Sequence, residues 1–118
     1  GLNALAAAVY LAALGKHGLR SLAQVVYHRA HHAAARIAAL GGYEIVSKAP
    51  FFQEFVVACP QPARVINQRL WERHGIIGGY DLGQLDPAWE RRMLVCVTEM
   101  NPAAQIDALV AALEEVAA

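Results

Sequence analysis

The opening stretch NALAAAVYLAAL, residues 3–14, constrains the fold more than any other segment, because it contains no charged side chain. Its composition favours a helix, with Asn3 placed to cap the start and Gly15 placed to end it. A helix that is apolar on every side is normally covered on nearly all sides. The run from Ala4 to Leu14 is too short to cross a bilayer core of ~30 Å. We therefore expect this helix to pack against protein.

The start of the chain suggests that residues 1–118 are one domain within a longer protein. The sequence begins with Gly1 rather than Met and enters the apolar run at once. Apolar residues make up 57% of the chain, and we expect part of this content to be a surface that faces material outside it. The formal net charge of +0 at pH 7 gives no electrostatic reason to expect binding to nucleic acid or membrane.

Periodicity along the rest of the chain predicts alternating helices and strands. Helical spacing recurs over residues 19–40, from Pro62 to Gly75, and over 101–116, where Asn101 is placed as the cap. Residues 43–47, 51–59 and 91–99 are predicted as strands. This order predicts an α/β chain of the α+β kind. We expect a two-layer sandwich in which a small, mainly antiparallel three-stranded sheet carries helices on one face.

The histidines in HRAHH are the first candidates for chemistry. His28 and His32 lie one turn apart on a predicted helix, as zinc ligands often do, and His31 lies beside them. However, Arg29 follows His28 where the HExxH pattern has glutamate, and no further ligand is indicated. A solvated polar face is the favoured interpretation, and a hydrolase metal site built on these residues is a remote alternative.

The stretch ERHGIIGGYDLGQL, residues 72–85, gathers His74, glycines, a tyrosine and an aspartate. A phosphate-binding loop normally has a helix start directly behind it, whereas this loop leads toward a strand. We therefore interpret the glycines as allowing close backbone approach. The predicted interface residues are Gly78, Gly79, Tyr80, Asp81 and, on the first helix, Tyr10.

Other reactive side chains give no clear site. Lys16 lies in a predicted corner and Lys48 at a strand end, and neither looks desolvated enough to form a Schiff base. Cys59 and Cys96 have no metal-ligand spacing, and both are predicted to be buried, reduced thiols. Reduced thiols favour a cytoplasmic location. Whether His74 or the strand-end Glu99 approaches an active site is left open by the sequence.

Four segments carry a family resemblance over nearly the whole chain: NALAAAVYLAALGKHGL, FFQEFVV, HGIIGGYDLG and MLVCVTEMNPAAQIDALVAAL. Together they resemble the C-terminal part of glycine dehydrogenase (decarboxylating), the P-protein of the glycine cleavage system, in its bacterial subunit 1 form. The resemblance implies the C-terminal small domain of a fold type I pyridoxal-phosphate enzyme. Such an enzyme decarboxylates glycine and passes the aminomethyl group to the lipoyl-bearing H-protein.

The resemblance also implies where the chemistry does not lie. The cofactor lysine of this family belongs to a large domain, and in the two-subunit form to the other subunit. No catalytic, cofactor-binding or metal-binding residue is therefore expected on this chain, and the expected partners are the second subunit and the H-protein. We also expect the isolated chain to be able to self-associate. The alternative is an independent α/β protein-binding or regulatory module without catalytic activity.

Overall fold

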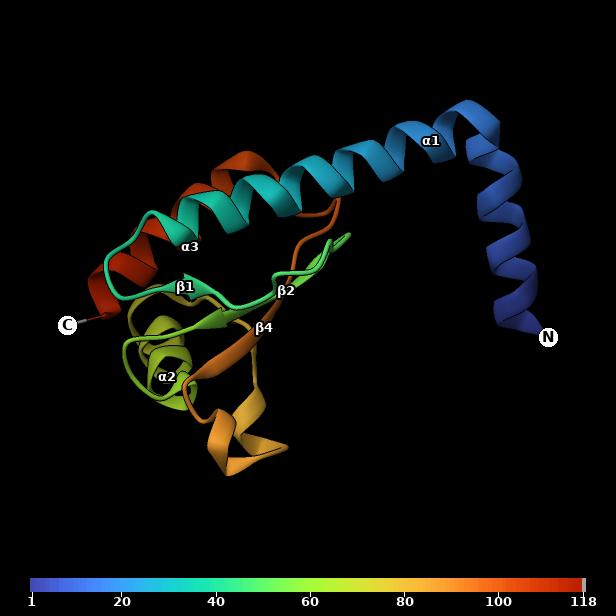
Figure 1. The fold of residues 1–118 in the computed structure, drawn as a ribbon. Helices are drawn as coiled ribbons and strands as arrows, with labels where there is room; N and C mark the ends of the chain where they lie inside the picture. The colour runs from blue at the N-terminus through green and yellow to red at the C-terminus, as the bar shows by residue number, and fades with distance from the viewer. Residues whose placement is uncertain (118) are drawn as a thin grey trace.

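The computed structural model describes residues 1–117 and contains three helices and a four-stranded sheet (Figure 1). The helices are α1 (Leu2–Ala38), α2 (Ala63–His74) and α3 (Ala103–Val116). The strands are β1 (Glu44–Ile45), β2 (Glu54–Ala58), β3 (Tyr80–Asp81) and β4 (Arg92–Cys96). Two short 3-10 turns, η1 (Leu82–Gln84) and η2 (Pro87–Trp89), lie between β3 and β4.

Helix α1 is broken at Gly15, so the prediction that a first helix ends there is confirmed. Gly15 has φ 64° and ψ −176°, a backbone conformation that glycine adopts without a steric penalty. Figure 1 shows the chain turning sharply in this part of α1, so that the first segment stands apart from the sheet. The predicted cap at Asn3 is wrong, because Gly1 occupies the N-cap position and the helix starts at Leu2.

The sheet has the order β1-β2-β4-β3 and is antiparallel throughout. The predicted three-stranded sheet is therefore wrong in strand number. The additional strand, β3, lies inside the glycine-rich loop and pairs Tyr80 with Leu94 and Asp81 with Met93. A strand of two residues is too short to show an alternating pattern, which explains why the sequence did not indicate it.

One side of the sheet forms the core with all three helices. Along β2 and β4, alternate residues are buried, and they belong to one cluster with residues of α1, α2 and α3. These buried strand residues are Phe55, Val57, Met93 and Val95. The predicted apolar stripe of residues 19–40 is confirmed at its centre, where Ala30, Ala33 and Ile37 are each 0% exposed.

Helix α3 starts differently from the prediction. Pro102 is its N-cap residue and provides no side-chain cap. The side chain of Asn101 instead accepts a hydrogen bond from the Thr98 N–H at 2.9 Å and donates one to Gln105 Oε1 over 3.4 Å. The cap predicted at Asn101 is therefore wrong, and this carboxamide organises the loop before the helix instead.

Substitution of Gly79 by alanine is expected to destabilise the chain by about 1–3 kcal/mol, the usual range for overpacking a core. A Cβ atom at this position would lie 2.6 Å from the carbonyl oxygen of Leu94 and 3.0 Å from the Met93 side chain. Gly41→Ala is the matched control, because no atom lies within 4 Å of its Cβ position. Urea unfolding compares the two variants, and equal losses of unfolding free energy would contradict this packing argument.

Alkaline pH is expected to destabilise the fold through Cys59. Burial, and then the nearby Asp81 carboxylate, raises the pKa of this thiol from 9.0 to about 12. Above pH 9 the unfolded chain loses a proton that the folded chain retains, so the free energy of unfolding falls by up to about 1.4 kcal/mol per pH unit. Burial also raises the pKa of Tyr43, whose hydroxyl donates to the Leu113 carbonyl at 2.8 Å.

The measurement is urea unfolding at a series of pH values. The stabilisation should be complete below pH 9 and should be lost as the pH rises toward the folded pKa of about 12. The variant Cys59→Ala should show a shallower alkaline decline than the parent chain. Identical pH profiles for the two proteins would contradict this role of Cys59.

Candidate functional site

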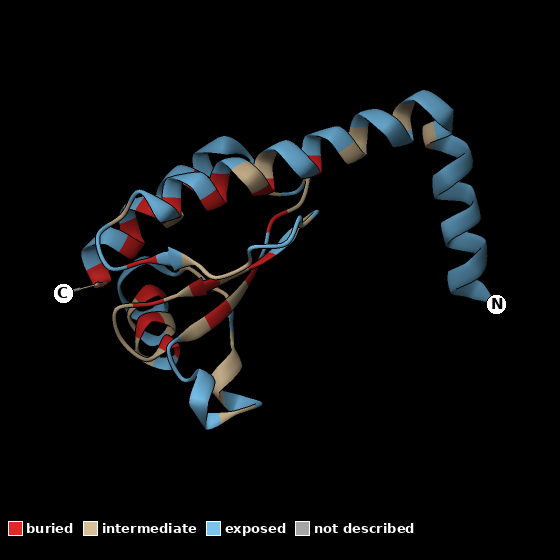
Figure 2. Ribbon diagram, viewed as in Figure 1, coloured by how far each residue is buried: buried red, intermediate tan, exposed pale blue. Residues whose placement is uncertain are grey.

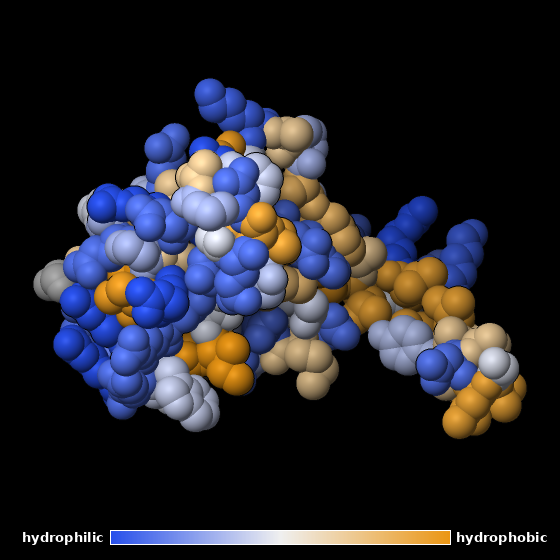
Figure 3. All heavy atoms as spheres, turned by 90° about the horizontal axis from the view of Figure 1, so that it is seen from below, coloured by the Kyte–Doolittle hydropathy of each residue, from blue (hydrophilic) through white to orange (hydrophobic). Residues whose placement is uncertain are grey.

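The first segment of α1, residues 2–14, is the most distinctive surface of the molecule, and we call it the arm. Every residue from Leu2 to Ala13 is exposed, as Figure 2 shows. Leu2 is 80% exposed, Leu5 62% and Val9 60%. Figure 3 shows apolar residues gathered along this projecting segment. An uncharged helix with large aliphatic side chains in water on all sides is typical of a surface that another protein covers.

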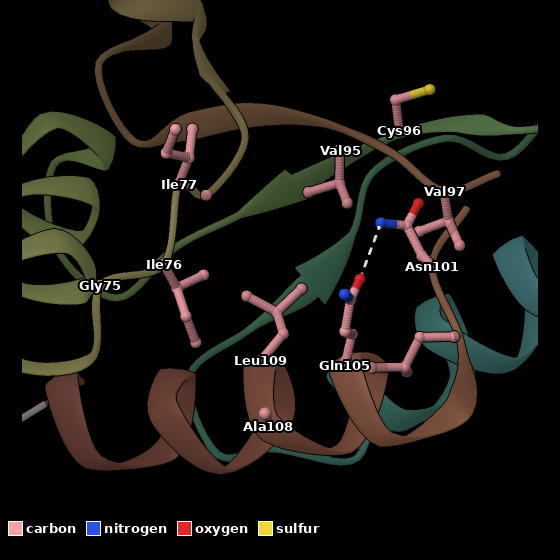
Figure 4. A pocket seen from close by; sticks show the side chains of 12 residues that line it. Gly75, Ile76, Ile77, Val95, Cys96, Val97, Asn101, Gln105, Ala108 and Leu109 are labelled. Carbon is pink, nitrogen blue, oxygen red and sulfur yellow. Dashed lines mark hydrogen bonds between the residues drawn. The ribbon is translucent and has the colours of Figure 1, made fainter.

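A cavity of about 370 Å³ is the second feature. It lies between the loop that follows α2, the end of β4 and residues 105–109 of α3. Figure 4 shows Ile76, Val95 and Leu109 around it, with the carboxamides of Asn101 and Gln105 joined by a hydrogen bond on one side. None of its twelve lining residues carries a charged side chain. The cavity is therefore suited to an uncharged group, and not to a phosphate or a carboxylate.

The predicted interface residues occupy different environments. Tyr10 and Tyr80 are 50% and 48% exposed, so both phenol rings are available to a partner. Asp81 accepts a hydrogen bond from the Gly83 N–H at 2.9 Å and so caps η1. Gly78 and Gly79 approach the chain's own Asn67 and Leu94 closely, which explains their need for glycine. A contact of these five residues with another chain stays a prediction.

The histidines are used differently from zinc ligands. The ring of His31 stacks on Phe51 with the centroids 4.1 Å apart, and its Nε2 lies 3.0 Å from the Phe51 carbonyl oxygen. Its neighbours His28 and His32 are exposed on the outer side of α1. Within residues 1–117 no group of three or more histidine, cysteine or acidic side chains is arranged to hold a metal ion. His31 instead joins α1 to the segment before β2.

The two residues left open by the sequence both connect separate elements of the chain. His74 Nε2 lies 3.3 Å from Glu115 Oε2, which connects the end of α2 to α3. The carbonyl oxygen of Glu99 accepts a hydrogen bond from Arg29, which connects the β4–α3 loop to α1. Neither residue lines the cavity. Their positions are explained by packing between elements.

The cysteines and lysines lie at the surface, with one exception. Cys59 is buried, as predicted, whereas Cys96 is exposed, so the prediction that both thiols are buried is wrong for Cys96. Cys96 is at the last position of β4, and alternate residues of this strand face away from the helices. Lys16 and Lys48 are both exposed. A Schiff-base lysine is normally desolvated, and neither side chain has that environment.

The cavity was not evident from local sequence patterns. The cavity combines residues from three separated stretches, and the sequence of each stretch shows only that it is largely apolar.

The long α1 helix gives no membrane signal: within residues 1–117, no helix combines the length and the hydropathy that a transmembrane span requires.

Sequence comparison finds close similarity to one group of bacterial proteins. The chain is 52% identical over 118 residues to the probable glycine dehydrogenase (decarboxylating) subunit 1 of Thermomicrobium roseum, which covers 100% of this chain and 26% of that protein. It is 45% identical over 115 residues to the protein of the same name from Listeria welshimeri, covering 98% of this chain and 25% of that protein. No protein-family model matches the chain.

Structure comparison gives the same result. The fold matches a crystal structure of glycine decarboxylase (P-protein) of the glycine cleavage system in inhibitor-bound form, with a TM-score of 0.83 and 34% sequence identity. The match covers 92% of this chain and 24% of that protein. The chain therefore spans about a quarter of the length of the proteins it resembles.

Proposed function

This chain is homologous to about a quarter of glycine dehydrogenase (decarboxylating) subunit 1, and from this premise we propose that it is the C-terminal small domain of such a subunit. The complete enzyme would decarboxylate glycine with pyridoxal phosphate in a bacterial cytoplasm and pass the aminomethyl group to the lipoyl-bearing H-protein. A second subunit would be its permanent partner. This chain would be a supporting lobe that completes the enzyme without taking part in the chemistry.

The residues of this chain do not fit pyridoxal phosphate. Lys16 and Lys48 are exposed and neither lines the cavity, although the cofactor needs a desolvated lysine. The cavity also presents no cationic side chain that would hold the phosphate. We therefore assign the binding of the cofactor and the chemical steps to parts of the enzyme outside this chain.

The observation that carries the proposal is the exposed arm. Burial of a large aliphatic side chain such as Leu5 or Val9 contributes about 1.5–3 kcal/mol. An uncharged helix that leaves several such groups in water gains stability only when another surface covers it. In the proposed enzyme this surface belongs to the rest of subunit 1 or to the second subunit. The isolated chain would then self-associate through the arm.

Reconstitution tests the proposal. The Thermomicrobium roseum subunit 1 is prepared without its region equivalent to this chain, together with the second subunit, and release of labelled carbon dioxide from glycine is measured. Addition of this chain should restore the activity, whereas the chain alone should release none and should not form an aldimine absorbance with pyridoxal phosphate. An aldimine absorbance of the isolated chain that disappears in Lys16→Ala or Lys48→Ala would refute the supporting role.

The alternative is an independent protein-binding module, which the exposed arm and the exposed His28 and His32 also favour. Such a module would use the arm to bind a protein unrelated to glycine cleavage. The same reconstitution separates the two possibilities, because a module of this kind would leave the truncated enzyme inactive and would not associate with it.

A further inference from the structure

Strand β4 is paired on both sides over only part of its length. On one side β4 pairs with β2 over all five residues, from Arg92 to Cys96. On the other side it pairs with β3 only at Met93 and Leu94. Continuation of this register would place Gly78 opposite Cys96, but residues 75–79 are outside any strand. The last part of β4 is therefore a sheet edge, and the cavity lies beside it.

The backbone of Cys96 points toward that open side. The Val97 N–H donates to the Gln53 carbonyl oxygen at 3.0 Å, so Val97 faces the β2 side of the sheet. Main-chain groups alternate between the two sides of a strand. The N–H and C=O of Cys96 consequently face the side on which β3 has already ended. An added strand could therefore accept a hydrogen bond from the Cys96 N–H and donate one to the Cys96 C=O.

The carboxamides at the cavity complement a peptide group. Asn101 is held in place because its Oδ1 accepts the Thr98 N–H at 2.9 Å. Its bond to Gln105 is long, at 3.4 Å, and the Gln105 side chain makes no other hydrogen bond within residues 1–117. Bonds beyond about 3.2 Å are weak and are exchanged at little cost. The pair thus presents N–H donors and a carbonyl acceptor, the complement of an amide.

We propose that this cavity and the adjoining edge of β4 form a docking site for an extended, uncharged peptide segment of a partner chain that carries one bulky aliphatic side chain. The absence of charge from the lining selects an uncharged segment, since a charged group placed there would lose its hydration without gaining a partner. The aliphatic side chain fills the space between Val95 and Leu109. The main chain of the segment continues the sheet beyond Tyr80, which is the strand-addition mode of peptide recognition.

The proposed docking site does not depend on whether the chain belongs to a glycine-decarboxylating enzyme. The site is also separate from the arm, because its lining comes from residues 75–109. A test can therefore leave the arm unchanged and can fail independently of the proposed function.

The test is a titration of the isotopically labelled chain with acetyl-Gly-Val-Leu-Val-Gly-amide, followed by NMR. The backbone amide signals of Cys96, Val97 and Leu109 should shift in a saturable manner. A peptide with aspartate in place of its central leucine, and one N-methylated at both valines, whose N–H groups face β4 when the leucine side chain enters the cavity, should each bind at least about tenfold more weakly. Loss of binding with the N-methylated peptide reports the main-chain hydrogen bonds.

Two variants of α3 locate the binding site. Ala108 is exposed and lines the cavity, so Ala108→Phe fills it without disturbing the core. Ala111 is exposed on the same helix and lies outside the lining, so Ala111→Phe is the matched control. Ala108→Phe should weaken peptide binding by about tenfold, and Ala111→Phe should change it by less than about twofold.

Three outcomes would overturn the proposal. The first is the absence of saturable shifts at Cys96 and Val97. The second is equal binding of the three peptides, which would mean that the cavity binds neutral groups non-selectively. Equal effects of the two phenylalanine variants would likewise overturn it, because the peptide would then bind elsewhere. The third is the appearance of the same shifts on concentration of the chain without peptide, because the occupant would then be a second copy of the chain.

Discussion

Replacement of both Leu5 and Val9 by glutamate is expected to weaken the association of this chain with the remainder of a homologous subunit 1 by at least about a hundredfold. The two side chains are 62% and 60% exposed in the chain itself, so the substitution removes no internal contact of consequence. In the complex each would lose its burial energy and place a carboxylate in an apolar interface. Isothermal titration calorimetry against the truncated Thermomicrobium roseum subunit measures the affinity.

The matched control places two glutamates on another exposed surface. Ala104 and Ala111 are exposed on α3, so the double variant Ala104→Glu/Ala111→Glu makes the same change in net charge away from the arm. It should retain the parent affinity, and both double variants should keep the parent unfolding free energy. Equal weakening by the two double variants would mean that net charge, and not the arm, controls the association.

Truncation of Phe55 to alanine is expected to destabilise the fold by about 3–5 kcal/mol, the largest effect of any single substitution proposed for this chain. Phe55 is 1% exposed in β2, and its ring centroid lies 5.3 Å from that of Phe51 in a tilted arrangement. Its removal leaves a cavity where the sheet meets the helices. Urea unfolding followed by circular dichroism gives the free energy of unfolding.

Phe52 provides the comparison, because it precedes the same strand and is 49% exposed. Phe52→Ala should cost less than about 1 kcal/mol, since a half-exposed ring contributes little to the core. A similar loss for the two phenylalanines would contradict the assignment of Phe55 to the core and of Phe52 to the surface.

Helical periodicity was the most reliable guide to this fold. The helical spacing predicted over residues 101–116 is confirmed in α3, where Ile106, Val110, Leu113 and Val116 are buried and Leu109 is partly exposed beside the cavity. The glycine at position 15 also marked the break in α1 correctly. These signals are local, because one turn of helix brings residues three and four positions apart onto the same face.

The strands were harder to delimit from sequence. The strand predicted over 43–47 contains only Glu44 and Ile45, and the strand predicted over 91–99 ends at Cys96. Strand boundaries depend on the partner strand, and the bulk of the pairing here is between β2 and β4. The exposure of Cys96 follows from the same fact, because the register of that pairing decides which residues face the helices.

The two candidate surfaces differ in how far the sequence predicted them. The arm was evident because twelve consecutive positions without a charge require covering, wherever the rest of the chain lies. The cavity was not, because Ile76, Val95 and Leu109 come together only through the packing of α2, β4 and α3. The predicted interface glycines were correctly interpreted as close-approach positions, and the neighbours they approach lie within this chain.

Hydrogen–deuterium exchange tests most directly the claim that the arm is the surface through which this chain meets the rest of the enzyme. In the isolated chain, at concentrations low enough to keep it monomeric, the arm is a short exposed helix, so its amides should exchange rapidly. Addition of the truncated subunit 1 and the second subunit should slow the exchange of residues 2–14 by at least about a hundredfold, as expected for a helix buried at an interface. Unchanged exchange of the arm in an active, reconstituted enzyme would show that its apolar surface is not where this chain meets the rest of the protein.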